Sequence, residues 1–264
     1  MTYEDIIYER DEAGIVTITI NRPEKLNAFR SETVDELVDA FGAAWRDRGC
    51  GVVILTGAGE RAFCVGGDQS ARGGGGGYGT TAKHDVGIDI EDLHTLIRDI
   101  PKPVIAAVNG YAIGGGHVLH VLCDLTLASE NAVFGQAGPR VGSFDAGLGT
   151  GYLARVIGEK RAREIWFLCR QYSPQQALEW GLVNRVVPAG ELKAEVRKWA
   201  DEILRLSPTA LKMLKQSFNT DTEHFVGIGQ MAYSTLELFT DSDEAREGIA
   251  AFNEKRAPEF AAFR

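Results

Sequence analysis

Three consecutive glycines, Gly114–Gly116, lie between an apolar strand-like segment and an apolar helical segment. The preceding residues 104–108 are apolar and rich in β-branched side chains, which predicts a buried strand. We expect a helix from His117. Glycines at the beginning of a helix let backbone N–H groups approach a ligand oxygen, and the helix dipole adds a positive field there. The turn therefore suits an oxyanion or a phosphate, or it only permits close packing. The local pattern leaves both interpretations open.

Composition mainly limits the partners of the chain. The 264 residues are enough for one large domain with a sizeable core, and the formal net charge is −9. This acidity argues against nucleic acid or an anionic membrane as the main partner. We find no signal peptide and no run of membrane-spanning length, so we expect a cytoplasmic protein. Four widely spaced cysteines are expected to be reduced core thiols: Cys50, Cys64, Cys123 and Cys169.

The order of the elements predicts an α/β fold with crossover connections. Apolar side chains alternate with threonine over residues 14–20, which indicates a strand, and Ser31 is a suitable N-cap for the helix that follows. Further strands are expected over residues 52–56 and 62–68, and the second of these runs into another glycine turn. Strands that alternate with helices favour crossover units over a sandwich.

The second half of the chain becomes increasingly helical. Residues 134–151 contain six glycines and predict a long irregular loop, which in a compact domain is usually functional. Ser173 and Ser207 are each followed by proline, and both pairs are typical helix starts. We therefore divide the chain into an α/β core, residues 1–190, and a helical C-terminal region, residues 191–264.

A glycine-rich segment, residues 72–78, carries five consecutive glycines between an arginine and a tyrosine. Such a run cannot form a regular element, because glycine loses much entropy on ordering and has no side chain to pack. It is either a disordered surface loop or a flap over a site. Residues 85–100 carry apolar side chains at helical spacing, so we expect a helix that Pro101 terminates.

Three motifs, residues 21–28, 62–68 and 110–116, together resemble the crotonase (enoyl-CoA hydratase/isomerase) superfamily, and the similarity extends over essentially the whole chain. The resemblance implies repeated ββα units and C-terminal helices that build homotrimers, often paired into hexamers. It also implies an acyl-CoA thioester as substrate, with no separate cofactor. The thioester oxygen would lie between the backbone N–H groups of Gly67 and Gly115, an arrangement that stabilises an enolate.

Membership of the superfamily does not determine the reaction, because the side chains around the oxyanion hole do that. The hydratases carry two catalytic glutamates, and the matching positions in this sequence are Val118 and Gly138. Neither residue can transfer a proton. The resemblance therefore disfavours a simple enoyl-CoA hydratase.

A narrower resemblance, carried by residues 66–69, 114–120, 134–139 and 141–147, is to two sister groups. One is the 2-ketocyclohexanecarboxyl-CoA hydrolases, which open a ring with water. The other is the 1,4-dihydroxy-2-naphthoyl-CoA synthases of menaquinone biosynthesis, which close a ring of o-succinylbenzoyl-CoA. Both reactions make or break a C–C bond beside a thioester enolate.

Two positions favour the hydrolase. Ser70 matches the hydrolase, whereas the synthase has a lysine there. Ala137 replaces a threonine of the synthase, at a place where one synthase subgroup uses bicarbonate as a base. We therefore expect ring-opening hydrolysis of a cyclic β-keto acyl-CoA, with the synthase as the alternative. A catalytically silent, oligomeric acyl-CoA-binding relative is a third hypothesis.

The candidate proton-transfer residue is Asp145. It lies between an aromatic residue and small residues, which predicts desolvation and a raised pKa, although aspartate is also common in turns. Under the resemblance, Ser143 would donate a hydrogen bond to a second substrate carbonyl. Both sister groups carry a tyrosine where this chain has Thr240. Tyr233, about two helical turns earlier, or Tyr78 in the glycine-rich segment would then supply the phenol.

The remaining candidates would bind the substrate or its CoA portion, and most are assigned by the resemblance. Lys25 and Lys255 would bind CoA phosphates, or they are ordinary solvated charges. Arg72 would anchor a carboxylate, or it is a surface charge. The full set is Lys25, Leu26, Ala28, Asp68, Gln69, Arg72, Gln136, Gly138, Trp166, Phe252 and Lys255.

Three side chains with metal-ligand chemistry, His117, His120 and Asp124, fall on one face of the expected helix. The other residues between His117 and Asp124 are mostly valine and leucine. We therefore favour packed core histidines, and we expect no metal.

Overall fold

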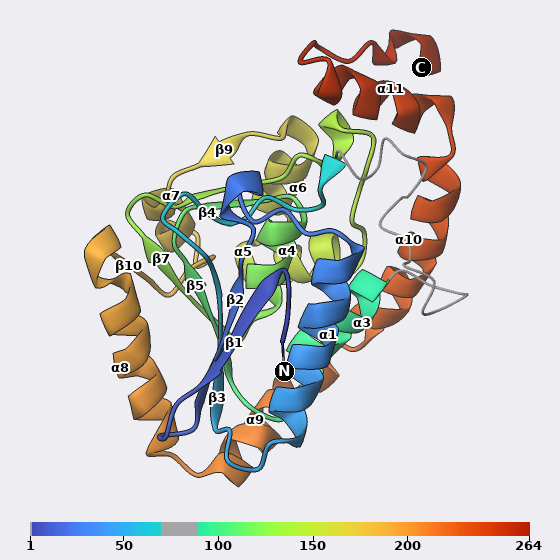
Figure 1. Ribbon diagram of the computed structural model, residues 1–264. Coiled ribbons are helices and arrows are strands. Elements are labelled where there is room, and N and C mark those ends of the chain that lie inside the picture. The colour runs from blue at the N-terminus through green and yellow to red at the C-terminus, as the bar shows by residue number, and fades with distance from the viewer. Residues whose placement is uncertain (1, 70–88) are drawn as a thin grey trace.

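The computed structural model describes residues 2–69 and 89–264 of the chain (Figure 1). Its larger sheet has six strands in the order β1-β2-β3-β5-β7-β10. All neighbours are parallel except β1 and β2. The strands are β1 (Ile6–Arg10), β2 (Ile15–Ile20), β3 (Val52–Gly57), β5 (Val104–Val108), β7 (Leu125–Ser129) and β10 (Arg185–Val187).

A smaller sheet has the order β4-β6-β8-β9. Its strands are β4 (Ala62–Cys64), β6 (Tyr111–Ile113), β8 (Val133–Gly135) and β9 (Gln171–Tyr172). Strands β3, β5 and β7 of the larger sheet are each followed along the chain by a strand of the smaller one. The chain therefore repeats one ββα step and advances by one strand position in both sheets with each repeat.

Helices cover the sheets and form the end of the chain (Figure 1). The helices of the α/β part are α1 (Ser31–Arg46), α3 (Asp89–Asp99), α4 (Gly115–Leu122), α5 (Leu153–Ile157), α6 (Glu159–Leu168) and α7 (Pro174–Glu179). The C-terminal helices are α8 (Leu192–Leu204), α9 (Pro208–Asp221), α10 (His224–Thr240) and α11 (Asp243–Asn253).

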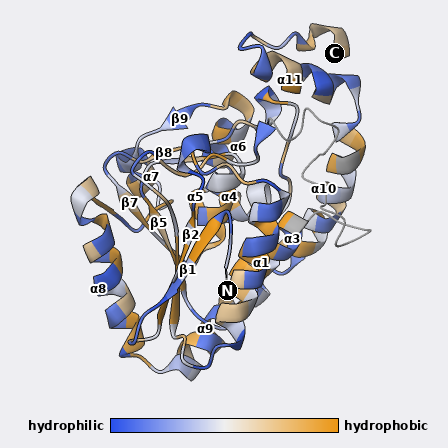
Figure 2. Ribbon diagram, in the orientation of Figure 1, coloured by the Kyte–Doolittle hydropathy of each residue, from blue (hydrophilic) through white to orange (hydrophobic). Residues whose placement is uncertain are grey.

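Two buried clusters lie on the two faces of the larger sheet. The larger cluster joins one face to α1, α3 and α4, and it includes Phe41, Leu93 and Leu119. The smaller cluster joins the other face to α8. In Figure 2 the central strands are mainly orange, whereas α8 alternates blue and orange, as expected for a helix with one buried face. The helical region from Leu192 thus begins with a helix that shares the core of the sheet.

Most of the predicted elements are present. The chain has the expected α/β fold with parallel crossovers and a helical C-terminal region. All four cysteines are free and buried, as predicted. Ser173 caps α7 by accepting a hydrogen bond from the Gln176 N–H, and Ser207 caps α9 in the same way from the Ala210 N–H.

Several sequence predictions were wrong in detail. Helix α4 begins at Gly115 and not at His117, because glycine tolerates the helical first turn here. The N-cap of α1 is Arg30 and not Ser31, since the Thr33 hydroxyl accepts the Arg30 N–H. The loop at 134–151 contains part of β8, a 3₁₀ turn and one π-helical turn, Leu148–Tyr152. Strands β1, β6 and β9 were not predicted.

None of the helices in the described parts of the chain is both long enough and apolar enough to cross a membrane.

Apolar side chains are exposed along the C-terminal helices. Phe218 on α9 is 76% exposed, and Leu238 on α10 is 79% exposed. Exposed apolar patches of this kind mark interaction surfaces. We therefore predict that the chain assembles with copies of itself in solution, as the resemblance implies.

Light scattering after size exclusion should give three or six times the 28.7 kDa chain mass. Phe218→Asp and Leu238→Asp should each shift the protein toward smaller species, because an interface cannot bury an unpaired carboxylate cheaply. Leu178→Asp, on exposed α7 outside the C-terminal region, is the matched control. A monomeric wild-type protein at micromolar concentration would refute the prediction.

Candidate active site

A pocket lies between the two glycine turns, α3, α10 and the loop after β8. More than half of the predicted site residues line it: Gly67, Gln69, Gly115, Gln136, Gly138, Ser143, Asp145, Trp166 and Tyr233. The sequence interpretation thus brought together residues that are far apart along the chain. Their chemical roles remain predictions.

The two glycine turns are in direct contact. Gly66 has a φ of +85°, and a Cβ there would lie 2.9 Å from the Gly115 nitrogen. A Cβ on Gly115 would lie 2.7 Å from Cζ of Phe29. Since a real Cβ does not approach other atoms this closely, a side chain on Gly66 would force the turns apart, and one on Gly115 would displace the Phe29 ring. The close approach of the two turns therefore requires glycine at position 66.

Two backbone N–H groups remain available at this contact. The Phe29 N–H donates to the Gly66 carbonyl over 2.9 Å, and the Asp68 N–H donates to the Phe29 carbonyl over 2.8 Å, which bypasses the N–H of Gly67. Gly115 is the first residue of α4, where helix geometry provides no acceptor. Among the described residues, neither N–H has a hydrogen-bond acceptor. Both residues line the pocket, so the arrangement can hold an oxyanion.

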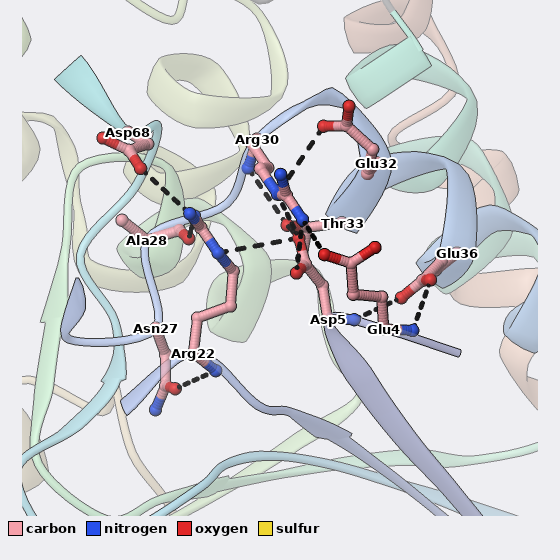
Figure 3. A network of polar contacts seen from close by, with 10 residues as sticks. All are labelled: Glu4, Asp5, Arg22, Asn27, Ala28, Arg30, Glu32, Thr33, Glu36 and Asp68. Carbon is pink, nitrogen blue, oxygen red and sulfur yellow. Dashed lines mark hydrogen bonds and ion pairs between the residues drawn. The ribbon is translucent and has the colours of Figure 1, made fainter. Parts of the chain in front are cut away.

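A largely buried ion-pair network fixes the chain around Gly67 (Figure 3). Arg22 Nη2 pairs with Asp68 Oδ2 at 3.1 Å, and Arg22 Nη1 donates to the Ala28 carbonyl. Oδ2 of Asp5 accepts a hydrogen bond from Nε of Arg30 over 2.8 Å. The Asp68 carboxylate, a candidate for substrate binding, therefore lies in a structural ion pair directly after Gly67.

Asp145 is the one acid among the described residues that line the pocket. Oδ1 accepts the Gly149 N–H over 3.1 Å, and Oδ2 lies 3.4 Å from the hydroxyl of Tyr233. Burial raises the pKa of this carboxyl from 3.8 to about 7, although both hydrogen bonds counteract the rise. A group with this pKa can accept and return a proton near neutral pH.

Trp166 holds the backbone turn that binds the Asp145 carboxylate. Its indole Nε1–H donates to the Gly149 carbonyl over 2.8 Å, while the Gly149 N–H donates to Asp145. The indole ring also packs on Gly138, where a Cβ would lie 3.2 Å from Cζ3. Trp166, a candidate for substrate binding, therefore also positions the turn that holds the carboxylate.

Tyr233 reaches the pocket from α10, and it contacts a residue that the sequence analysis missed. Its hydroxyl lies 2.7 Å from Nδ1 of His94, which is 1% exposed and also lines the pocket. Burial lowers the pKa of His94 to about 3, so its imidazole is neutral. The sequence feature that could have revealed His94 is its place on the apolar face of the helix predicted at residues 85–100, between positions that pack into the core.

The positions of the hydratase glutamates carry no acid. Val118 is 1% exposed within α4, and Gly138 begins a 3₁₀ turn against the Ser143 backbone. Ser143 is buried at the pocket wall, where a hydroxyl can meet a substrate oxygen. Gln136 lies 3.4 Å from Nδ1 of His117 and completes this wall.

Several candidates do not line the pocket. Leu26 and Lys25 lie in the turn after β2, and Ala28 follows them. Phe252 and Lys255 lie at the exposed end of α11 and beyond it. Their assignment to the CoA portion remains a prediction. Arg72 and Tyr78 lie outside the described residues.

The two histidines of the candidate metal set lie in the packed interior, whereas Asp124 is partly exposed. His120 Nδ1 lies 3.3 Å from the Thr126 hydroxyl, and its ring stacks edge-on against Phe134. The Asp124 carboxylate pairs with Nζ of Lys215 at 2.7 Å. His117 is 1% exposed beside Gln136. Each of the three has its own structural contact, and both histidines are packed in the core, as the favoured interpretation predicted.

The fold and the two converging N–H groups define a crotonase-type α/β protein. The chain belongs to the enoyl-CoA hydratase/isomerase family, whose sequence pattern it matches over residues 10–262. The following known structures are similar to it.

An enoyl-CoA hydratase from Mycobacterium avium subsp. paratuberculosis K-10 is 29% identical over 98% of this chain and 100% of that chain, with a TM-score of 0.87. A carnitinyl-CoA hydratase from Mycobacterium avium is 30% identical over 99% of this chain and 100% of that chain, with a TM-score of 0.85. An enoyl-CoA hydratase from Bacillus anthracis is 31% identical over 97% of this chain and 98% of that chain, with a TM-score of 0.74.

The packing of the Phe29 ring on the Gly115 turn can be tested by Gly115→Ala. The added Cβ would overlap the Phe29 ring, so we expect a loss of stability of about 1–3 kcal/mol in thermal or urea unfolding. Phe29→Leu in the same chain should restore part of that loss, because it removes the overlapping ring atoms. Gly190→Ala, where a Cβ would meet open space, is the control. A fully stable Gly115→Ala protein would show that the Phe29 ring does not pack tightly on Gly115.

The raised pKa of Asp145 predicts a pH-dependent stability. The folded state binds the proton more tightly than the unfolded chain, so this contribution is full below about pH 4 and is lost as pH rises through about 7. Asp145→Asn removes the dependence. Between pH 5 and pH 8, the variant should therefore gain about 1–3 kcal/mol relative to wild type in urea unfolding.

Asp241→Asn, on the exposed C-terminal end of α10, is the matched control and should follow the wild-type pH profile. Parallel profiles for wild type and Asp145→Asn would mean that the Asp145 carboxyl titrates normally.

Proposed function

We propose that the chain is an acyl-CoA enzyme that opens the ring of a cyclic β-keto acyl-CoA with water, by retro-Claisen chemistry. The observation that carries the proposal is the position of Asp145. A carboxyl with a pKa of about 7 lines the same pocket as the unpaired N–H groups of Gly67 and Gly115. This combination supplies a base and an oxyanion hole in one cavity.

The steps follow from these groups. Asp145 takes a proton from water as the water oxygen bonds to the ring ketone carbon. The bond between that carbon and the α-carbon of the thioester then breaks, and its electron pair forms the thioester enolate. The N–H groups of Gly67 and Gly115 stabilise the enolate oxygen. Asp145 returns the proton to the α-carbon, and the product is a dicarboxylic acyl-CoA. No cofactor beyond the coenzyme A of the substrate is needed.

Hydration of an enoyl-CoA fits the described residues less well. That reaction needs acid–base groups that add water across a double bond, and the glutamate positions are a buried valine and a glycine. Similar structures are named hydratases, but at 29–31% identity the catalytic side chains can differ while the fold stays the same.

The second candidate is ring closure by a 1,4-dihydroxy-2-naphthoyl-CoA synthase. The same oxyanion hole would stabilise the nucleophilic enolate of o-succinylbenzoyl-CoA. Gln136, Gly138 and Trp166, which this interpretation uses, all line the pocket. Ala137 lacks the hydroxyl beside which bicarbonate would serve as base, so the synthase is the less favoured direction. A silent acyl-CoA-binding relative is disfavoured because it would not need a carboxyl with a pKa near 7.

Incubation with 2-ketocyclohexanecarboxyl-CoA, followed by mass analysis, should give the ring-opened pimeloyl-CoA. Asp145→Asn should lower kcat about 10²–10⁴-fold, because an amide cannot accept the proton. The wild-type rate should rise with pH through about 7, since the ionised carboxylate is the active form. Asp241→Asn should retain the wild-type rate.

If the protein forms a naphthoyl product from o-succinylbenzoyl-CoA and does not open the ring of 2-ketocyclohexanecarboxyl-CoA, the synthase assignment would replace the hydrolase assignment. Hydration of crotonyl-CoA at a rate that Asp145→Asn leaves unchanged would refute both C–C bond assignments.

A further inference from the structure

A short polar chain connects three elements at the pocket. Oδ2 of Asp145 lies 3.4 Å from the hydroxyl of Tyr233, which lies 2.7 Å from Nδ1 of His94. The carboxyl comes from the loop after β8, the phenol from α10 and the imidazole from α3. We propose that His94 is a positioning residue, whose Nδ1–H donates to the Tyr233 oxygen and directs the phenolic O–H toward Asp145 and the pocket.

The direction of the hydrogen bonds follows from counting protons. An ionised carboxylate can only accept, so a hydrogen bond between Asp145 and Tyr233 must use the phenolic proton. A phenol has one proton, and its oxygen can then only accept from His94. This requires the proton of the neutral imidazole to be on Nδ1.

The other ring nitrogen supports the same tautomer. Nε2 of His94 is buried and has no hydrogen-bond partner among the described residues. A buried N–H without an acceptor leaves a donor unsatisfied, and such donors are rarer in native structures than under-satisfied acceptors. With the proton on Nδ1, Nε2 is a bare acceptor. Burial keeps His94 neutral, so its ring carries one N–H proton. The short contact with the Tyr233 hydroxyl favours this proton on Nδ1.

The consequence concerns Tyr233. Its oxygen is held by His94, so the phenol cannot turn its proton toward the histidine, and a hydrogen bond received by the oxygen strengthens the O–H as a donor. The phenolic O–H is then preorganised toward Asp145 in the empty pocket and toward a substrate oxygen in the filled one. The catalytic part of this inference rests on the proposed function, whereas the tautomer does not.

The tautomer can be measured without any substrate. We would label the five histidines with ¹⁵N and record ring-nitrogen shifts at pH 8, with the His94 signal identified by its loss in His94→Asn. We expect a protonated Nδ1 and an unprotonated Nε2. A protonated Nε2 with a bare Nδ1 would overturn the proposal whatever reaction the enzyme catalyses.

Two variants separate positioning from packing. The side-chain amide of His94→Asn can place an N–H donor near the position of Nδ1, whereas His94→Leu fills space without a donor. With the ring-opening substrate, His94→Leu should lose about 10–100-fold in kcat with KM changed less than about threefold, and His94→Asn should recover most of the loss. His224→Leu, at the exposed start of α10, should resemble wild type.

A second readout does not depend on turnover. Because the Tyr233 hydrogen bond lowers the pKa of Asp145, His94→Leu should move the pH midpoint of the Asp145-linked stability change upward, and His94→Asn should leave it near the wild-type value. If no substrate turns over but the tautomer and this midpoint behave as expected, the proposed function fails and the positioning role stands. If His94→Asn and His94→Leu behave alike in both readouts, the positioning role fails.

Discussion

The site depends on the contact between two glycine turns, one after β4 and one after β6. These strands are parallel neighbours in the smaller sheet, with Ala62 opposite Tyr111 and Cys64 opposite Ala112. Turns that follow adjacent parallel strands leave the sheet at the same edge. The ββα repeat therefore places Gly67 and Gly115 beside each other, although they are far apart along the chain. A side chain on Gly66 would break this contact, because its Cβ would lie 2.9 Å from the Gly115 nitrogen.

The C-terminal helices complete the pocket through equally close contacts. Gly147 has a φ of +88°, and a Cβ there would lie 2.5 Å from the Gly229 nitrogen of α10. A Cβ on Gly142 would lie 2.4 Å from the Ala245 carbonyl of α11. Glycine therefore lets both helices pack on the backbone of the loop that carries Asp145. This packing brings Tyr233 to the carboxyl, so the C-terminal helical region is part of the pocket wall and cannot be removed without changing the pocket.

Local patterns in the sequence were sufficient to predict the parallel strands, the helical C-terminal region and the second glycine turn, because each follows from residue periodicity or a terminating residue. They also made Asp145 a candidate for proton transfer, because its neighbours indicate desolvation of the carboxyl. They could not give β6 and β9, which are three and two residues long and form only because other strands pair with them. His94 was missed for a related reason. Its role depends on contacts with Tyr233 and Asp145, which come from distant parts of the chain, and no local pattern contains those contacts.

Under the proposed function, the position of the acid would let this family member differ from a hydratase while the two glycine turns stay in place. In α4 the relevant position is Val118, which is buried, so the helix that supplies one N–H supplies no proton. The one described acid of the pocket instead comes from the loop after β8 and is held by Gly149 and Tyr233. Under the proposed function, a base in the loop would meet a different substrate atom from a base on the helix, while the N–H groups of Gly67 and Gly115 would still hold the enolate oxygen. The pocket wall that carries the carboxyl, and not the oxyanion hole, would then determine which bond is made or broken.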